Sequence, residues 1–310
     1  MGSKIDGAHP VVWSNPRYKA RNVYIFMGYH GGLFDSTEFV QSVSQRYLLG
    51  DRSMTKFCSA LSLTLVLCAR GAIAQPAGQP AAPPRVLLFF SLNVEADHVL
   101  FATDALRFFA EESDRYGFRV DATSNWADMN DENLKRYQLI VWLNNIPPRE
   151  QQQAFEHYME NGGAWLGFHV AAYNDRNSRW PWFRQFLGGS AFGVNSWPPL
   201  PAKLIVDDTE SPITRGIPKT FQSPNNEWYA WRPSPRLDKN VHVLLTLDPA
   251  EYPLGIKGLI TEKDPDVPVV WTNTRFKMLY MNMGHGDAIF VSPTQNKLIE
   301  NGILWLLGKN

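Results

Sequence analysis

The stretch that decides the fold is Gly162-Gly163-Ala164-Trp165-Leu166-Gly167-Phe168-His169-Val170-Ala171-Ala172-Tyr173-Asn174-Asp175. A short apolar run ends in Gly-Phe-His, and small residues follow it before a polar, aromatic segment. In an open α/β fold, a buried parallel strand that stops at such a turn presents its last side chain at the carboxyl edge of the sheet, where ligands bind. The same order of strand, sharp turn and helix displays the nucleophile in families that carry one. The sequence therefore predicts that His169 stands at a functional edge.

The chain around this stretch alternates between apolar runs and amphipathic segments. The predicted elements of the first half are strands at Arg85–Leu92, Phe118–Thr123, Leu139–Leu143 and Gly163–His169, with helices at Asp97–Glu112 (capped by Asp97) and Arg149–Asn161. Strands that alternate with helices indicate an α/β fold with a doubly wound, mostly parallel sheet and helices on both faces.

The second half is richer in strand and loop signals. Its predicted elements are strands at Ala202–Val206, Val241–Leu247, Val267–Thr272 and Met278–Met283, long loops at Tyr173–Leu200 and Gln222–Leu237, and a last helix from the cap Ser292 to Gly308. Loops of that length in a compact domain are usually functional or disordered, and their aromatic content opposes disorder.

Residues 1–53 contain a partial internal repeat. His9–Lys19 resembles Val267–Lys277, and after an offset of two residues Val23–Tyr29 resembles Leu279–His285. One strand pair cannot bury a core alone. We interpret residues 1–53 as the C-terminal piece of a sibling domain or as sequence translated from a misplaced start; the alternative is an extension that adds strands to the main sheet.

Residues 54–74 have the three parts of a secretory signal peptide. A lysine follows Met54, an apolar run extends from Phe57 to Ala69, and Ala72-Ile-Ala74 matches a cleavage site. The apolar run is short for a membrane span, so we expect no stable membrane insertion. The mature protein would then begin near Gln75 and be periplasmic or secreted, with a Pro/Ala linker at 75–84 and the folded domain at 85–310. A buried N-terminal helix is the alternative.

Composition narrows the classes of partner. Thirty basic and thirty acidic residues cancel, which gives no support for nucleic-acid binding. The sequence has neither a GxGxxG motif nor a P-loop, and no cofactor or oligomeric state is assigned. Both cysteines, Cys58 and Cys68, precede the domain, so the domain has no cysteine nucleophile and no thiolate ligand.

Three polar residues are the predicted catalytic set: His169, Glu227 and His285. Each falls where a loop meets an expected strand end. Two imidazoles and a carboxylate suit acid–base chemistry, because histidine titrates near neutrality and a carboxylate can orient it. The same set could form a 2-His-1-carboxylate metal site, but no tight metal-binding spacing occurs and no metal ligand is assigned. Hydrogen bonding to loop backbone is the structural alternative for each residue.

Further residues are predicted to contact a small, sugar-like ligand. They lie after the first strand, after His169, or in the long loops, and they are His98, Asn93, Tyr173, Asn174, Trp182 and Trp228. Large aromatic faces with polar tips suit sugars. The tryptophans could equally serve as lids packed over the sheet edge.

Together these motifs resemble the ThuA-like (trehalose utilisation) family. The resemblance covers Arg85–Gly308 and is most specific at Asp97-His98, Gly162-Gly163…Gly167-Phe168-His169, Asn226-Glu227-Trp228-Tyr229 and Pro268-Val-Val-Trp271…Gly284-His285, with Trp180-Pro-Trp182 and Ser292-Pro-Thr-Gln-Asn296 typical of an exported bacterial subgroup.

The resemblance implies a flavodoxin-like fold, similar to that of the class I glutamine amidotransferases, and a link to carbohydrate metabolism. The amidotransferases place a cysteine where His169 stands here, so glutamine hydrolysis through a thioester is excluded by residue type. Three functions remain open: an exported enzyme that acts on a sugar or sugar derivative by His/Glu acid–base chemistry, a non-catalytic carbohydrate-binding or scaffold protein, and a metal-dependent hydrolase or isomerase.

Overall fold

The computed structural model describes residues 12–14, 23–25, 82–175, 177–253 and 266–309. The chain divides into two compact units, residues 1–78 and 79–310. The signal-peptide and linker assignments at 54–74 and 75–84 lie outside the described residues, apart from positions 82–84. The described part of the chain contains no helix long and apolar enough to cross a membrane.

The second unit is built on a mixed, mostly parallel sheet of nine strands in the order β4-β3-β5-β6-β13-β12-β11-β8-β9. Its parallel part consists of β3 (Arg85–Phe90), β4 (Arg119–Thr123), β5 (Leu139–Leu143), β6 (Ala164–Phe168) and β13 (Phe276–Met281). The order begins β4-β3-β5-β6, which is the flavodoxin-like winding. The prediction of a doubly wound α/β sheet is therefore confirmed.

The sheet continues through antiparallel strands. These are β12 (Pro268–Asn273), β11 (Val241–Leu247), β8 (Leu200–Val206) and β9 (Thr220–Asn226). A separate antiparallel pair joins β7 (Ala191–Asn195) to β10 (Tyr229–Arg232). The sequence predicted loops at Tyr173–Leu200 and Gln222–Leu237, and this was wrong where β7, β9 and β10 form. Gly193 lies within β7, Pro224 lies within β9, and Pro233 directly follows the four-residue β10, so the usual strand signals are weak there.

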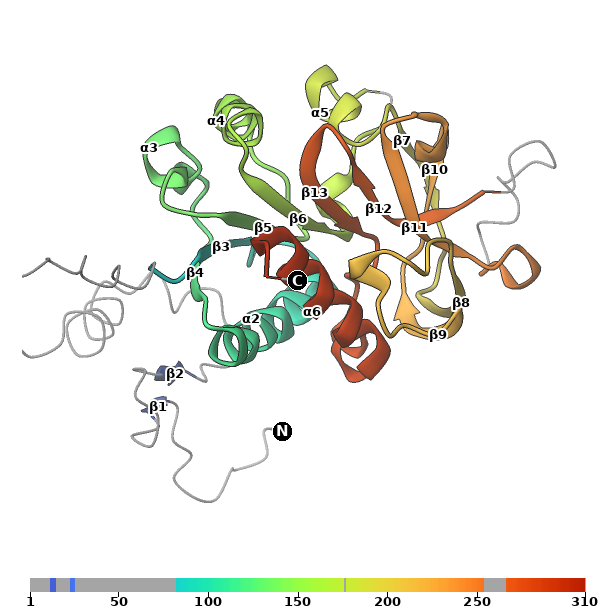
Figure 1. Cartoon of the computed structure of the whole chain (residues 1–310), viewed down its shortest axis with the longest axis horizontal. Coiled ribbons are helices and arrows are strands. Elements are labelled where there is room, and N and C mark those ends of the chain that lie inside the picture. Colours follow the sequence, from blue (N-terminus) through green and yellow to red (C-terminus); the bar gives the residue numbers. More distant parts are fainter. Residues whose placement is uncertain (1–11, 15–22, 26–81, 176, 254–265, 310) are drawn as a thin grey trace, which may run out of the picture. The chain divides into compact units, whose positions relative to one another are not determined.

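Helices cover both faces of the sheet (Figure 1). They are α2 (Ala96–Tyr116), α3 (Asp131–Leu134), α4 (Arg149–Glu160), α5 (Pro181–Phe186) and α6 (Pro293–Leu307). Helix α6 has the predicted ends, since the Ser292 side chain accepts from the Gln295 N–H and Gly308 is left-handed. Helix α2 is longer than the predicted Asp97–Glu112, since it extends from Ala96 to Tyr116. Glu95 rather than Asp97 holds the cap position, without a side-chain hydrogen bond.

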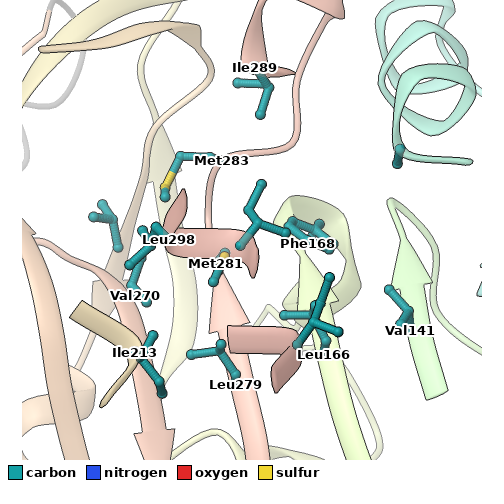
Figure 2. Packing of buried hydrophobic residues seen from close by; sticks show 14 of the residues in the cluster. Val141, Leu166, Phe168, Ile213, Val270, Leu279, Met281, Met283, Ile289 and Leu298 are labelled. Atoms are coloured by element: carbon teal, nitrogen blue, oxygen red, sulfur yellow. The ribbon is translucent and has the colours of Figure 1, made fainter. Parts of the chain in front are cut away.

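The two faces of the sheet bury separate apolar clusters, because alternate strand residues point to opposite sides. One cluster joins Val141, Phe168 and Met281 to α2 and α6, and Figure 2 shows part of it. The other joins Trp142 and Trp165 to α4 and α5. With helices packed on each face, the strand ends remain the places where polar side chains gather.

The first unit contains one described strand pair, β1 (Val12–Ser14) with β2 (Val23–Ile25). Its register places Trp13 opposite Tyr24, as β12 and β13 place Trp271 opposite Tyr280. The sequence repeat thus extends to strand pairing. Its interpretation as a sibling-domain fragment stays a prediction.

Candidate functional site

Four polar side chains converge at the carboxyl edge of the parallel strands. His98 lies in the first turn of α2, His169 directly follows β6, Glu227 follows β9, and His285 lies beyond the end of β13. One ligand atom from each residue lies within 4.8 Å of the ligand atoms of the other three. The structure therefore brings together the three predicted catalytic residues and His98.

The three imidazoles contact one another edge-on. Ring centroids are 5.4 Å apart for His98 and His169, 5.0 Å for His98 and His285, and 5.5 Å for His169 and His285. His169 is fully buried and His285 is 2% exposed. The side chains of Glu227 and His98 are 13% and 9% exposed, so the cluster meets solvent at these two residues.

Two residues beside the cluster adopt left-handed backbone conformations that are rare outside glycine. His169 has φ 50° and Asn144, which follows β5, has φ 58°. The backbone between β13 and His285 packs against both, because a Cβ at Gly284 would lie 2.6 Å from His169 Cβ and 3.2 Å from Asn144 Oδ1. Such strained positions persist where the surrounding structure holds them, and they concentrate at functional sites.

His169 and Glu227 form a hydrogen-bonded pair. The His169 Nε2 to Glu227 Oε2 distance is 3.1 Å. Asn195 donates from its side chain to the other carboxylate oxygen, Glu227 Oε1. The ring of Tyr229 packs on that of His169 with centroids 4.2 Å apart. This packing and the contacts to both carboxylate oxygens restrain the pair in one geometry.

Burial sets the charge of the pair. Desolvation lowers the pKa of His169, against the hydrogen bond to Glu227, which raises it. Burial is the largest single influence on Glu227 and raises its pKa, but the hydrogen bond from His169 and the charge interactions with the three histidines together outweigh it, so the net effect lowers that pKa. A neutral imidazole beside an ionised carboxylate is the state that both directions support. Desolvation also lowers the pKa of His98, to about 4, with the neighbouring histidines adding to the effect.

Asparagines, which sequence reasoning missed, position the cluster. Asn226 is fully buried, and its Oδ1 accepts from the N–H groups of Gly284 and His285, both at 3.0 Å. Asn282 contacts His169 Nδ1 at 3.3 Å. The sequence does carry a signal that could have identified some of them: asparagines interrupt apolar runs at strand ends, in Asn144-Asn145 and in Met281-Asn282-Met283.

The remaining predicted ligand-contact residues are spread around the cluster. Tyr173 is 38% exposed and stacks on Phe192, which in turn packs on Tyr229. Asn93 is exposed on the loop after β3. Asn174 is buried, with its Nδ2 donating to Ala172 O. Tyr173 and Asn93 thus remain open to a ligand.

Two tryptophans are not where a ligand at the cluster could reach them. Trp228 has no exposed surface and its indole N–H donates to Leu200 O, so the expectation that it stacks on a ligand is wrong. Trp182 packs on Phe276 at the start of β13 and donates to Glu160 at the end of α4. That is the edge of the sheet opposite to His285, because parallel strands start where α4 ends.

A surface cavity of about 780 Å³ also lies at this opposite edge, lined by Gly163 and Lys277 at the starts of β6 and β13. Its volume suits a small molecule, but the four converging residues do not line it. We take the cluster rather than this cavity as the candidate site, because the residues suited to proton transfer gather there.

Comparisons with known proteins point to one family. The family described as "ThuA: Trehalose utilisation" matches residues 85–306. A thua-like protein from Bacteroides uniformis has a crystal structure that is 42% identical, with a TM-score of 0.68, over 76% of this chain and 97% of that chain. A second, from Parabacteroides merdae, is 18% identical with a TM-score of 0.53, over 73% of this chain and 91% of that chain, and shows the fold alone. The search of curated proteins gave no match.

Proposed function

The chain belongs to the ThuA (trehalose utilisation) family, and on that premise we propose that it is an exported enzyme acting on a sugar or sugar derivative at the His98, His169, Glu227 and His285 cluster. The observation that carries the proposal is the convergence of these four side chains from segments far apart in the sequence. Convergent ionisable groups at the carboxyl edge of a doubly wound sheet are typical of an active site.

The chemistry we propose is proton transfer from the substrate to Glu227, which His169 orients. A carboxylate hydrogen-bonded to a buried neutral imidazole at 3.1 Å can accept a proton from a substrate hydroxyl or from water, and the imidazole holds that carboxylate in place. Sugars carry several hydroxyl groups of this kind. Tyr173 and Asn93, both exposed, are positioned to contact the parts of the sugar that do not react.

Residue type supports the exclusion of amidotransferase chemistry. The residue after β6 is His169, and the sequence of the domain at 85–310 contains no cysteine. An imidazole there leaves no thiol for a thioester. The proposed site therefore lies at the same edge of the sheet as the amidotransferase site, with a histidine in place of the cysteine nucleophile.

Export rests on residues 54–74 alone. We propose that the chain is cleaved near Gln75 and reaches the periplasm or the medium. N-terminal sequencing of protein produced from Met54 tests this: a secreted product that begins close to Gln75 supports export, and a cytosolic product that retains residues 54–74 refutes it.

A panel of sugars and sugar derivatives, assayed with the full chain, tests the activity. His169→Ala and Glu227→Gln should each lower turnover by about 10²–10⁴-fold, the usual contribution of a general acid or base. His157→Ala is the matched control, because His157 is an exposed histidine in α4. Turnover that survives His169→Ala removes this residue from the mechanism. Binding without turnover in the wild type would favour a carbohydrate-binding or scaffold protein.

A further inference from the structure

Two nitrogen atoms in the cluster are buried without any hydrogen-bond partner. They are His98 Nε2 and His285 Nε2. A carboxylate oxygen of Glu95 lies 4.0 Å from His98 Nε2, beyond hydrogen-bond distance. A buried polar atom that lacks a partner costs roughly 1–3 kcal/mol, and here two such atoms belong to one group of converging ligands. This points to a ligand between them that accepts imidazole lone pairs.

We propose that His98, His285 and Glu227 bind one divalent transition-metal ion, and that His169 stays outside the ligand set as the hydrogen-bond donor to Glu227. Imidazole and carboxylate ligands at bond lengths of about 2.0–2.2 Å lie roughly 3–4 Å from one another. The ligand atoms of the cluster already lie within 4.8 Å. Side-chain shifts of about an ångström would therefore complete the coordination.

The surroundings of His285 favour metal binding through Nε2. Its Nδ1 faces Asp97 Oδ2 at 3.6 Å. This is just beyond hydrogen-bond distance, but the negative charge on that side favours a ring proton on Nδ1 and leaves the lone pair on Nε2 free, which is the usual arrangement of a metal-bound histidine.

The surroundings of His169, in contrast, disfavour metal binding through Nε2. Asn282 Oδ1 accepts from the Tyr229 N–H at 3.1 Å, so its Nδ2 is the atom that faces His169 Nδ1 at 3.3 Å. Because that amide nitrogen donates, His169 Nδ1 accepts and the ring proton resides on Nε2. A nitrogen that carries a proton cannot bind a metal ion. His169 Nε2–H instead donates to Glu227 Oε2, as a supporting residue does to a metal-bound carboxylate.

The ligand set identifies the class of ion. Two neutral imidazoles and one carboxylate form the 2-His-1-carboxylate set that binds divalent first-row metals such as zinc or iron, with positions open to water or substrate. The proposal rests on the sugar-directed function only for the identity of the substrate, and in the metal-bound state Glu227 serves as a ligand rather than as the free base. Metal binding is measured without a sugar, so the two proposals fail separately.

The experiment uses the full chain after treatment with a chelator, titrated with Co²⁺ or Zn²⁺ alone in a calorimeter. We expect one ion per chain, and a loss of affinity of at least about a hundredfold in His98→Ala and His285→Ala. His169→Gln should lose less than about tenfold, because the glutamine amide can still donate to Glu227. His242→Ala is the control, since His242 is half-exposed and pairs with Asp208 at 2.7 Å. Circular dichroism checks that each variant is folded.

A second measurement needs no variant. In the proton spectrum of the Co²⁺-loaded wild type, each coordinated imidazole contributes one exchangeable, strongly shifted ring N–H signal, and we expect two. Three such signals, or none, would overturn the ligand set. The proposal also fails if the chelator-treated wild type binds neither ion stoichiometrically, or if folded His169→Gln loses as much affinity as His98→Ala.

Discussion

Replacing Gly284 with alanine should disturb the candidate site through a single added methyl group. Gly284 connects β13 to His285, its N–H donates to Asn226 Oδ1, and its carbonyl accepts from Asn144 Nδ2. Its φ is not positive, so alanine tolerates the backbone conformation. Any effect of Gly284→Ala must therefore come from the space that the new Cβ occupies.

That space is already filled. The added Cβ would lie 2.6 Å from His169 Cβ and 3.3 Å from Phe168 Cβ, whereas ordinary carbon contacts are about 3.5–4.0 Å. A Cβ atom cannot rotate away, so relief requires a movement of the backbone at His169, where φ is 50°. Overpacking of this kind costs about 1–3 kcal/mol. For a domain of this size, 1 kcal/mol corresponds to roughly 2–4 °C in Tm.

Gly302→Ala in α6 is the matched control. Its Cβ would lie 2.5 Å from Leu279 Cδ2 and 3.2 Å from Met281 Cε, but these are ends of flexible side chains that can move. Alanine also gains up to about 1 kcal/mol in helix propensity over glycine, so we expect a net change within about 1 kcal/mol. Thermal unfolding and Co²⁺ affinity of both variants test the reasoning. If Gly284→Ala is as stable as the wild type and binds Co²⁺ equally well, the close packing of His169 on this turn is refuted.

Three further changes test other contacts. Asn226→Ala should lower the free energy of unfolding, measured in urea, by about 2–5 kcal/mol, because the Gly284 and His285 N–H groups lose their shared acceptor. Asn226→Asp retains an acceptor oxygen and should lose less stability. Equal losses in the two variants would contradict this explanation. Glu112→Gln should raise Tm at pH 7, because burial raises the pKa of Glu112 above its ordinary 4.5. Ionised Glu112 therefore lowers the stability of the folded chain above the folded pKa, and this loss vanishes as pH falls below 4.5. A gain in Tm that is independent of pH would show that ionisation of Glu112 is not its cause. Trp228→Phe should lose about 0.5–1.5 kcal/mol with the buried indole hydrogen bond and leave ligand affinity unchanged, which titration with a sugar substrate would check.

The strands of the parallel half were predictable from the sequence because they are buried on both faces. Leu139–Leu143 is a continuous apolar run, and every residue of it is buried. The helix after Ser292 was predictable because its caps are local hydrogen bonds. Strands β7 and β10 were not, since each is short and is stabilised mainly by pairing with a segment more than thirty residues away, through contacts such as Tyr229 with Asn195.

The residues of the candidate site also divide into those that the sequence could identify and those that it could not. His169 and His285 were identifiable because each follows an apolar run with a glycine close before it, Gly167 or Gly284. Trp228 was misassigned because a tryptophan in a predicted loop looks available to a ligand. Its burial depends on the packing of β9 and β10, which only the folded chain shows.

The sequence by itself determined the composition of the site: which residue types end the strands, and that a histidine rather than a cysteine follows β6. Only the tertiary structure decided what those residues can do. The order β3-β5-β6-β13 brings strand ends together that are far apart in the chain, and so adds His98 to the cluster. The chemistry of an imidazole depends on which nitrogen bears the proton, and this depends on neighbours in space. Asn282 beside His169 and Asp97 beside His285 give two similar residues opposite roles.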